Sequence, residues 1–175
     1  MPQNFIKTQV SNVISAIQQD DSNSKAVFSA KTELQSGLKC SAQIRNFSLQ
    51  IDEPEQLGGT DEGPNPVELV LAALGTCQEI VYSAYAAVLG IPLNSVKVDV
   101  KGTLNLKGFF GIDEKVHPGF EEIAYTTSID SPASSEQLQQ LVQVVEKHCP
   151  VLDILTREIP VKGKVKLTNS LFSVN

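Results

Sequence analysis

The segment that decides the fold is one long apolar helix in the middle of the chain. Residues 65–90 read NPVELVLAALGTCQEIVYSAYAAVLG. Asn65 followed by Pro66 is a typical helix start, because asparagine caps the first free amides and proline fits the first turn. Gly90 is a typical helix end, since glycine readily adopts the left-handed conformation that closes a helix. The sequence therefore predicts a helix from Pro66 to about Leu89.

This helix is long enough to be mistaken for a membrane span, but its centre is polar. Gln78 and Glu79 lie in the middle of the apolar run, and an acidic side chain there costs about 2.5–3.5 kcal/mol even on lenient insertion scales. We therefore expect a helix buried in protein and no membrane partner. The first residues also lack a basic region followed by an apolar core, so a secretory signal is not expected.

The composition is that of an acidic globular protein. The chain has 175 residues, of which 41% are hydrophobic and 19% are charged. This length is typical of a single domain with a core of its own. The net charge of −6 and the small aromatic content, 6%, are unfavourable for binding a phosphate backbone, so no nucleic-acid partner is expected.

The region before the long helix divides into an arm and a set of strands. Residues 5–18 carry apolar side chains at helical spacing, and a polar linker follows. We therefore predict that residues 1–24 form a helical arm and linker, packed either on the body or on a partner subunit, and that residues 25–175 form one domain. Alternation over residues 25–52, with a turn at Gly37, predicts two or three antiparallel strands. The apolar positions of this alternation are Ala26, Phe28, Ala30, Cys40, Ala42, Ile44, Phe47, Leu49 and Ile51.

The region after the long helix predicts two more strands, two helices and a last strand. This order is α+β rather than a regular alternation of strand and helix. The expected strands are residues 96–106, 121–129 and 161–167, and the expected helices are residues 134–148 and 150–157.

Three cysteines are too few, and odd in number, for a disulfide scaffold, and they fit a reducing compartment. Cys40 shares the parity of apolar strand residues, which predicts a core position. Cys77 points along an apolar stripe of the long helix, which suits a small buried side chain as well as a reactive thiol. The stripe residues are Val70, Ala73, Leu74, Ile80, Val81, Ala84 and Val88.

Cys149 lies between two helices, because Pro150 can open a new one. A thiolate near a helix N-terminus is favoured by the free amides and the helix dipole, and this lowers its pKa. Cys77 and Cys149 could therefore form a redox pair, in which one becomes a sulfenic acid and the other condenses with it. This requires Cα atoms roughly 5–6 Å apart. Buried, inert thiols remain the alternative.

Two motifs together resemble the OsmC/Ohr family (osmotically inducible protein C and organic hydroperoxide resistance proteins), in its OsmC-like branch. They are GPNPVELVLAALGTC at residues 63–77 and EKHCPV at residues 146–151. The resemblance extends over roughly residues 27–167. It implies a two-layer α+β fold made as an intertwined homodimer, with antiparallel sheets wrapped around long central cysteine-bearing helices. It also implies active sites at the subunit interface.

The resemblance implies a cytoplasmic thiol-dependent peroxidase that reduces organic hydroperoxides to alcohols. Cys77 would be the nucleophile, and its sulfenic acid would form a disulfide with the resolving Cys149. An external dithiol would return the disulfide to thiols, and no metal or flavin cofactor is expected. The family's catalytic arginine would be Arg45, the one arginine before Cys77, although a solvated strand residue is the alternative reading of Arg45.

The chain departs from the family pattern where a glutamate is expected. That position, directly after Asn-Pro, is Val67, and Glu68 follows one residue later. On an ideal helix Glu68 lies about 180° around from Cys77. Two alternative functions stay open: a small-molecule-binding or redox-sensing protein without efficient peroxidase activity, and a structural chain with inert thiols.

Overall fold

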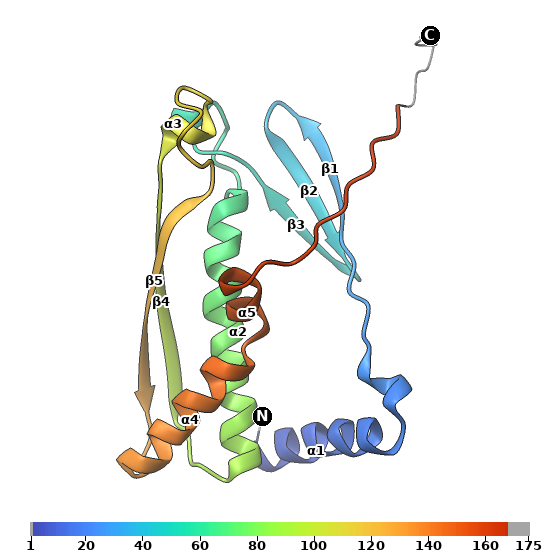
Figure 1. Ribbon diagram of the computed structural model, residues 1–175, viewed down its shortest axis with the longest axis vertical. Helices are drawn as coiled ribbons and strands as arrows, with labels where there is room; N and C mark the ends of the chain where they lie inside the picture. The colour runs from blue at the N-terminus through green and yellow to red at the C-terminus, as the bar shows by residue number, and fades with distance from the viewer. Residues whose placement is uncertain (1, 168–175) are drawn as a thin grey trace.

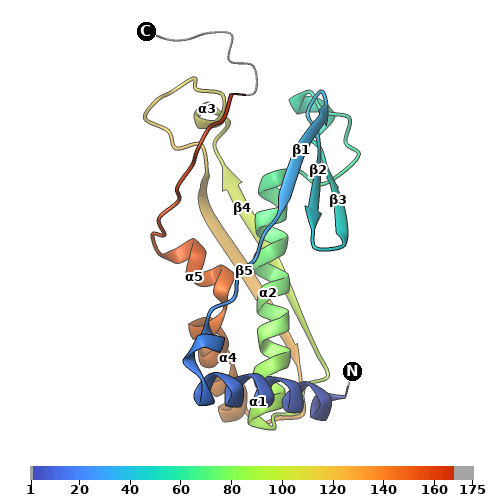
Figure 2. The same cartoon turned by 90° about the vertical axis from the view of Figure 1, so that its right-hand side faces the viewer.

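The computed structural model describes residues 2–167, and its architecture is α+β with antiparallel sheets, as predicted. The longer elements are α1 (Gln3–Gln19), β1 (Lys31–Ser36), β2 (Lys39–Ile44), β3 (Phe47–Ile51), α2 (Pro66–Leu89), β4 (Ser95–Leu104), β5 (Phe120–Asp130), α4 (Ser135–His148) and α5 (Pro150–Thr156). The short ones are three 3-10 or α-helical turns: η1 (Asp21–Ser24), η2 (Glu55–Leu57) and α3 (Leu106–Phe109). Figure 1 shows α2 upright in the middle, the β4–β5 hairpin along one side of it and the sheet β1–β2–β3 on the other. The view in Figure 2 shows α1 crossing the lower end of α2.

The limits of α2 agree with those predicted from the sequence. The Asn65 side chain accepts a hydrogen bond from the Glu68 amide, and the Glu68 carboxylate accepts one from the Asn65 amide at 2.8 Å. This reciprocal capping box satisfies donors that would otherwise be free at the helix start. Gly90 ends the helix in the left-handed conformation, with φ at 69°. The helix that carries Cys77 is therefore held at both ends by local sequence.

The hairpin β4–β5 forms a layer against which α2 packs closely. Side chains of both strands alternate between the α2 side and solvent. Gly75 brings the two backbones together, because a Cβ atom at this position would lie 3.3 Å from Cγ2 of Val100. The main core cluster lies at the lower end of α2, where α4 closes the layer. Its buried residues are Tyr82, Ala86, Ile91, Leu141 and Val145.

The buried face of α2 is not the face expected from the sequence. The buried residues on this helix are Leu74, Gly75, Gln78, Tyr82, Ala86 and Ala87. This face is centred near Gln78, about 100° around the helix from Cys77, because β4–β5 and α4 approach from that side. Cys77 is half-buried at its flank, and Ile80 of the predicted stripe is 68% exposed. A helix that is apolar on nearly all sides is typical of a larger core than one chain provides.

Within residues 2–167, α2 is the single helix whose length and apolar composition would allow it to cross a membrane. In the fold this helix packs against β4, α1 and α4. Leu74 and Ala86 on it are 1% and 0% exposed. One face of the helix is therefore part of the core, whereas the rest of it is not buried in the single chain.

The sheet β1–β2–β3 confirms the three predicted strands but begins later than expected. Gly37, with φ at 57°, makes the turn between β1 and β2. Residues 26–30 lie outside β1, and Phe28 is 91% exposed. The reason is the register: Lys31 already pairs with Gln43, next to the end of β2, so the preceding residues have no strand beside them.

The predicted last strand, residues 161–167, does not form within the chain. This segment has no regular secondary structure, and no strand of residues 2–167 pairs with it. Val161 and Val165 are 87% and 86% exposed. Alternation alone cannot make a strand, because the backbone also needs a neighbouring edge to bond to. The end of the predicted domain, residues 168–175, lies outside the described residues.

Candidate active site

The structure places Cys77 and Cys149 next to each other. Cys77 lies half-buried in the middle of α2, and Cys149, between α4 and α5, is 1% exposed. The two side chains are close enough for Cys149 to raise the pKa of Cys77, and both are free thiols. The distance between these residues cannot be predicted from their motifs, so their proximity is a finding of the structure. Proximity of the two thiols is one condition for a redox pair.

The joint between α4 and α5 produces this contact. Cys149 ends α4 and is also the N-cap residue of α5, and Pro150 occupies the first turn of α5. The sequence predicted that the free amides of α5 would favour a thiolate at Cys149. In the structure the Cys149 side chain makes no capping hydrogen bond, and the Val151 amide instead donates to the sulfur of Cys77. The start of α5 thus acts on Cys77.

The surroundings of Cys77 within the chain keep it protonated. Burial raises the pKa of the Cys77 thiol above its ordinary value, and the neighbouring Cys149 raises it further. The Val151 amide opposes them, because a hydrogen bond to the sulfur favours the thiolate. Neither neighbour carries a positive charge. For Cys77 to be ionised, a positively charged group would therefore have to come from another chain.

Arg45, the predicted catalytic arginine, does not provide that cation within the same chain. It forms the turn between β2 and β3 in the left-handed conformation, with φ at 56°. Its guanidinium lies over the ring of Phe47, with Cζ 5.0 Å from the ring centroid. This turn is at the outer end of the sheet, away from α2 (Figure 1). A catalytic role for Arg45 remains a prediction, and it requires that Arg45 reach the thiol of a second chain.

The carboxylates near the sequence motif are also engaged elsewhere. Glu68 belongs to the capping box and lies nine residues from Cys77, about 13 Å along the helix axis. Glu79 accepts a hydrogen bond from the Val98 amide of β4 at 3.2 Å. Val67, at the expected glutamate position, lines a largely apolar cavity of about 520 Å³ with Leu71 and others. We find no carboxylate of this group directed at Cys77.

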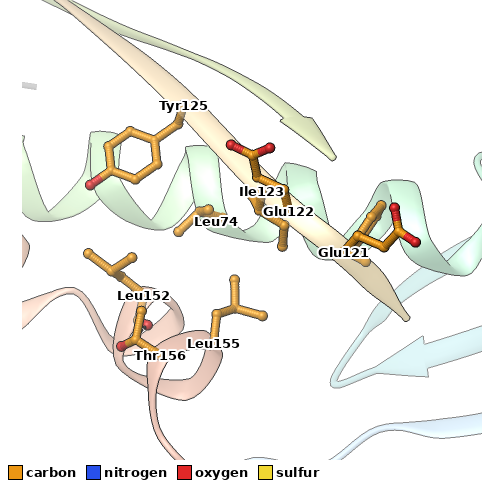
Figure 3. Close-up of a pocket in the computed structure, with 9 residues that line it drawn as sticks. Leu74, Glu121, Glu122, Ile123, Tyr125, Leu152, Leu155 and Thr156 are labelled. Atoms are coloured by element: carbon orange, nitrogen blue, oxygen red, sulfur yellow. Dashed lines mark hydrogen bonds between the residues drawn. The ribbon is translucent and has the colours of Figure 1, made fainter. Parts of the chain in front are cut away.

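A smaller cavity, of about 270 Å³, lies between α2, β5 and α5 (Figure 3). Neither cysteine lines it, but Leu74 of α2 lies one turn before Cys77 and Leu152 follows Val151, so the cavity is close to the two thiols. Leucines form its inner wall, and glutamates of β5 lie toward its rim. The lining residues are Leu74, Phe120, Glu121, Glu122, Ile123, Tyr125, Leu152, Leu155 and Thr156. A small apolar molecule with one polar end would fit such a space.

Sequence reasoning missed the Val151 amide and the β5 side of this site. The alternation of β5 could have revealed the β5 side, because it places Ile123, Tyr125 and Thr127 on one face. Nothing in the sequence could have revealed the role of the Val151 amide. Cys40, expected in the core, is half-buried on β2 instead, with its sulfur 3.8 Å from the Leu38 carbonyl oxygen.

Comparisons with known proteins agree with this architecture. Residues 59–164 match a family model described as OsmC-like protein. A Mycoplasma genitalium protein named hydroperoxide reductase is 29% identical over 114 residues, which cover 63% of this chain and 73% of that protein. An OsmC-like protein of Mycoplasma pneumoniae has a similar fold, with a TM-score of 0.65 and 22% identity, over 75% of this chain and 88% of that one. An organic hydroperoxide resistance protein of Legionella pneumophila gives a TM-score of 0.57 at 22% identity, over 75% and 92%.

Proposed function

This chain belongs to the OsmC-like protein family, and on that premise we propose that it is a thiol-dependent peroxidase that reduces organic hydroperoxides to alcohols. The observation that carries the proposal is the contact between the Cys77 and Cys149 thiols. The relative named hydroperoxide reductase supports the reaction class. The cavity beside the thiols offers room for an alkyl group.

The reaction needs two thiols and one hydroperoxide. The Cys77 thiolate attacks the terminal oxygen, so that an S–O bond forms and the O–O bond breaks. The sulfur loses two electrons, the peroxide gains them, and the leaving alkoxide takes up a proton to become the alcohol. The Cys149 thiol then attacks the sulfenic acid of Cys77 and releases water as the disulfide forms. An external dithiol reduces this disulfide and restores both thiols.

Cys77 must lose its proton before it attacks, and its own chain raises its pKa. A guanidinium within a few ångströms would reverse this, because an opposite charge favours the ionised form. We propose that Arg45 of a second chain supplies it. Arg45 is exposed at the tip of the β2–β3 turn and paired only with the Phe47 ring among the described residues, so it is available to another subunit.

The exposed apolar surface also supports a second chain. The chain exposes 13633 Å², whereas a folded monomer of this mass exposes about 8,300 Å². The excess, about 5,000 Å² per chain, is more than enough to supply the interface of an obligate dimer. It includes Phe28, Ile80 and Val161, which are 91%, 68% and 87% exposed. We propose a homodimer in which α2 is central and residues 161–167 join a sheet edge of the partner.

The experiment that tests the function follows cumene hydroperoxide consumption with a dithiol as reductant. We expect turnover by the wild type and none above the dithiol background for Cys77→Ser. Without the dithiol, Cys149→Ser should consume one equivalent and stop as a sulfenic acid, which dimedone traps. Cys40→Ser is the matched control, because it removes a half-buried thiol outside the site, and it should turn over like the wild type. Equal rates for wild type and Cys77→Ser would refute the proposal.

A second candidate function is a small-molecule-binding or redox-sensing protein that lacks efficient turnover. Val67 in place of the expected glutamate favours it, together with the larger apolar cavity that Val67 lines. This function predicts stabilisation by an apolar ligand, seen as an increased Tm, with slow or absent peroxide consumption. Rapid loss of both thiols at substoichiometric hydroperoxide would exclude it.

A further inference from the structure

Tyr125 extends from β5 across the cavity beside the cysteines. The alternation of the strand turns its side chain toward α2, on the same face as Ile123 and Thr127. Figure 3 shows the ring reaching past Leu74 with the hydroxyl on the side of Leu152, and it shows no hydrogen bond from this hydroxyl to the other residues drawn. Tyr125 thus presents a hydroxyl group to a cavity whose nearest other side chains are leucines.

Tyr125 faces the part of α2 that carries Cys77. Tyr125 lines the cavity together with Leu74, which lies one turn before Cys77 on α2. It also acts on Tyr82, about one turn after Cys77: burial and the charge of Glu146 raise the pKa of Tyr82, and Tyr125 adds to the increase. Tyr125 therefore faces the stretch of α2 from Leu74 to Tyr82, which includes Cys77.

The α5 side of the cavity lies next to a residue that contacts the Cys77 sulfur. Leu152 lines the cavity and directly follows Val151, whose amide donates to the Cys77 sulfur. A hydroperoxide whose terminal oxygen meets Cys77 would have its alkyl group among Leu74, Leu152 and Leu155. Its second oxygen, the one that leaves, would then lie on the side facing β5.

A donor is needed at that oxygen. Breaking the O–O bond puts a negative charge on the alkoxide, and a preorganised donor in an apolar cavity stabilises such a charge strongly. The expected family glutamate is absent, since Val67 holds its position, and Glu68 is engaged in the helix cap. Buried Gln78 has a side-chain nitrogen without a hydrogen-bond partner among the described residues. It packs on the same face of α2, but it does not line the cavity.

We infer that Tyr125 is the general acid of the peroxidase reaction, donating its hydroxyl proton to the leaving oxygen while the Cys77 sulfur takes the other. The tyrosinate formed recovers its proton from water. This inference rests on the proposed function. In this proposal the proton that the alkoxide needs comes from a side chain that lines the cavity for the substrate. Tyr125 should therefore matter only for hydroperoxides whose leaving group is a strong base.

The test compares two oxidants on Tyr125→Phe. Tert-butyl hydroperoxide leaves as an alkoxide and needs the proton, whereas peracetic acid leaves as acetate, a weak base that does not. We expect kcat/KM for tert-butyl hydroperoxide to fall by about 10²-fold, and the rate with peracetic acid to stay within about twofold of the wild type. Equal losses with both oxidants, or no loss with either, would overturn the role of Tyr125.

Tyr85→Phe is the matched control, because Tyr85 lies two turns beyond Cys77 and stacks on His148 with a ring that phenylalanine keeps. It should retain both rates. Thermal unfolding of the two variants shows whether either change disturbs the fold. The wild-type rate with tert-butyl hydroperoxide tests the proposed function separately: a wild type no faster than a free dithiol refutes the function and the role of Tyr125 together, whereas an active wild type with an unaffected Tyr125→Phe refutes only the latter.

Discussion

The uncovered side of α2 gives the sharpest prediction about assembly. Ile80 is 68% exposed in the single chain, although it lies in the middle of the most apolar helix. Burying a whole isoleucine side chain contributes about 1.5–3 kcal/mol, so covering its exposed part contributes about 1–2 kcal/mol. A twofold dimer covers it twice. Ile80→Asp should therefore cost at least about 2–4 kcal/mol per dimer, which raises the dissociation constant by about 30- to 1,000-fold.

Sedimentation velocity over a dilution series measures this effect. The wild type should sediment with twice the mass of one 18.9 kDa chain, and its Tm should rise with concentration because folding and association are linked. Ile80→Asp should dissociate at much higher concentration. Ile112→Asp is the control, because Ile112 is similarly exposed, 71%, but lies in the loop between α3 and β5. A monomeric wild type, or equal dissociation of both variants, would exclude the exposed side of α2 as the dimer interface.

Three further predictions concern charged groups. Arg45→Ala should shift the pH dependence of Cys77 alkylation by iodoacetamide upward, because the chain's own surroundings raise the Cys77 pKa and the cation would be lost; an unchanged profile would exclude Arg45 as that cation. Glu68→Ala should lower stability by about 1 kcal/mol through loss of the cap in chemical denaturation and leave peroxide turnover intact; lost turnover at unchanged stability would give Glu68 a catalytic role. Asp52 accepts hydrogen bonds from Thr60 and three amides, and these hold its pKa at about 2. Because the pKa of Asp52 is lower in the folded than in the unfolded chain, the ionised carboxylate stabilises the fold above about pH 4, and this stabilisation is lost as the pH falls toward 2. The Tm difference between wild type and Asp52→Asn should therefore narrow between pH 4 and pH 2. A constant Tm difference would contradict this role of Asp52.

Local patterns predicted the elements well where the responsible residues are close in sequence. Asn65, Pro66 and Gly90 define α2 through caps that involve only neighbouring residues. Pro150 likewise opens α5 at the expected position. The short helix α3 was missed, because it lies within a glycine-rich stretch that carries no periodicity.

The features that the sequence could not predict depend on which elements meet. Alternation predicted a strand over residues 161–167, but a strand forms only where an edge is available, and none within residues 2–167 pairs with it. The stripe around Cys77 was inferred from apolar residues alone. α2 is apolar on several sides, so the packing of β4–β5 and α4 decided that the buried face is centred near Gln78 instead.

The candidate site shows the same division. The two cysteines were identified from their motifs, whereas their contact depends on how α5 folds back on α2. The Val151 amide could not be predicted, because every residue except proline carries one. Tyr125 could have been placed on the α2 side of β5 by parity, but not beside Cys77.

The most direct test of the account is the product of one equivalent of cumene hydroperoxide with the reduced protein, followed by alkylation and peptide mass spectrometry. We expect a single disulfide joining Cys77 and Cys149, with Cys40 alkylated in full. A Cys77 that remains alkylatable after oxidation, or a disulfide that includes Cys40, would contradict the assignment of Cys77 and Cys149 as the redox pair.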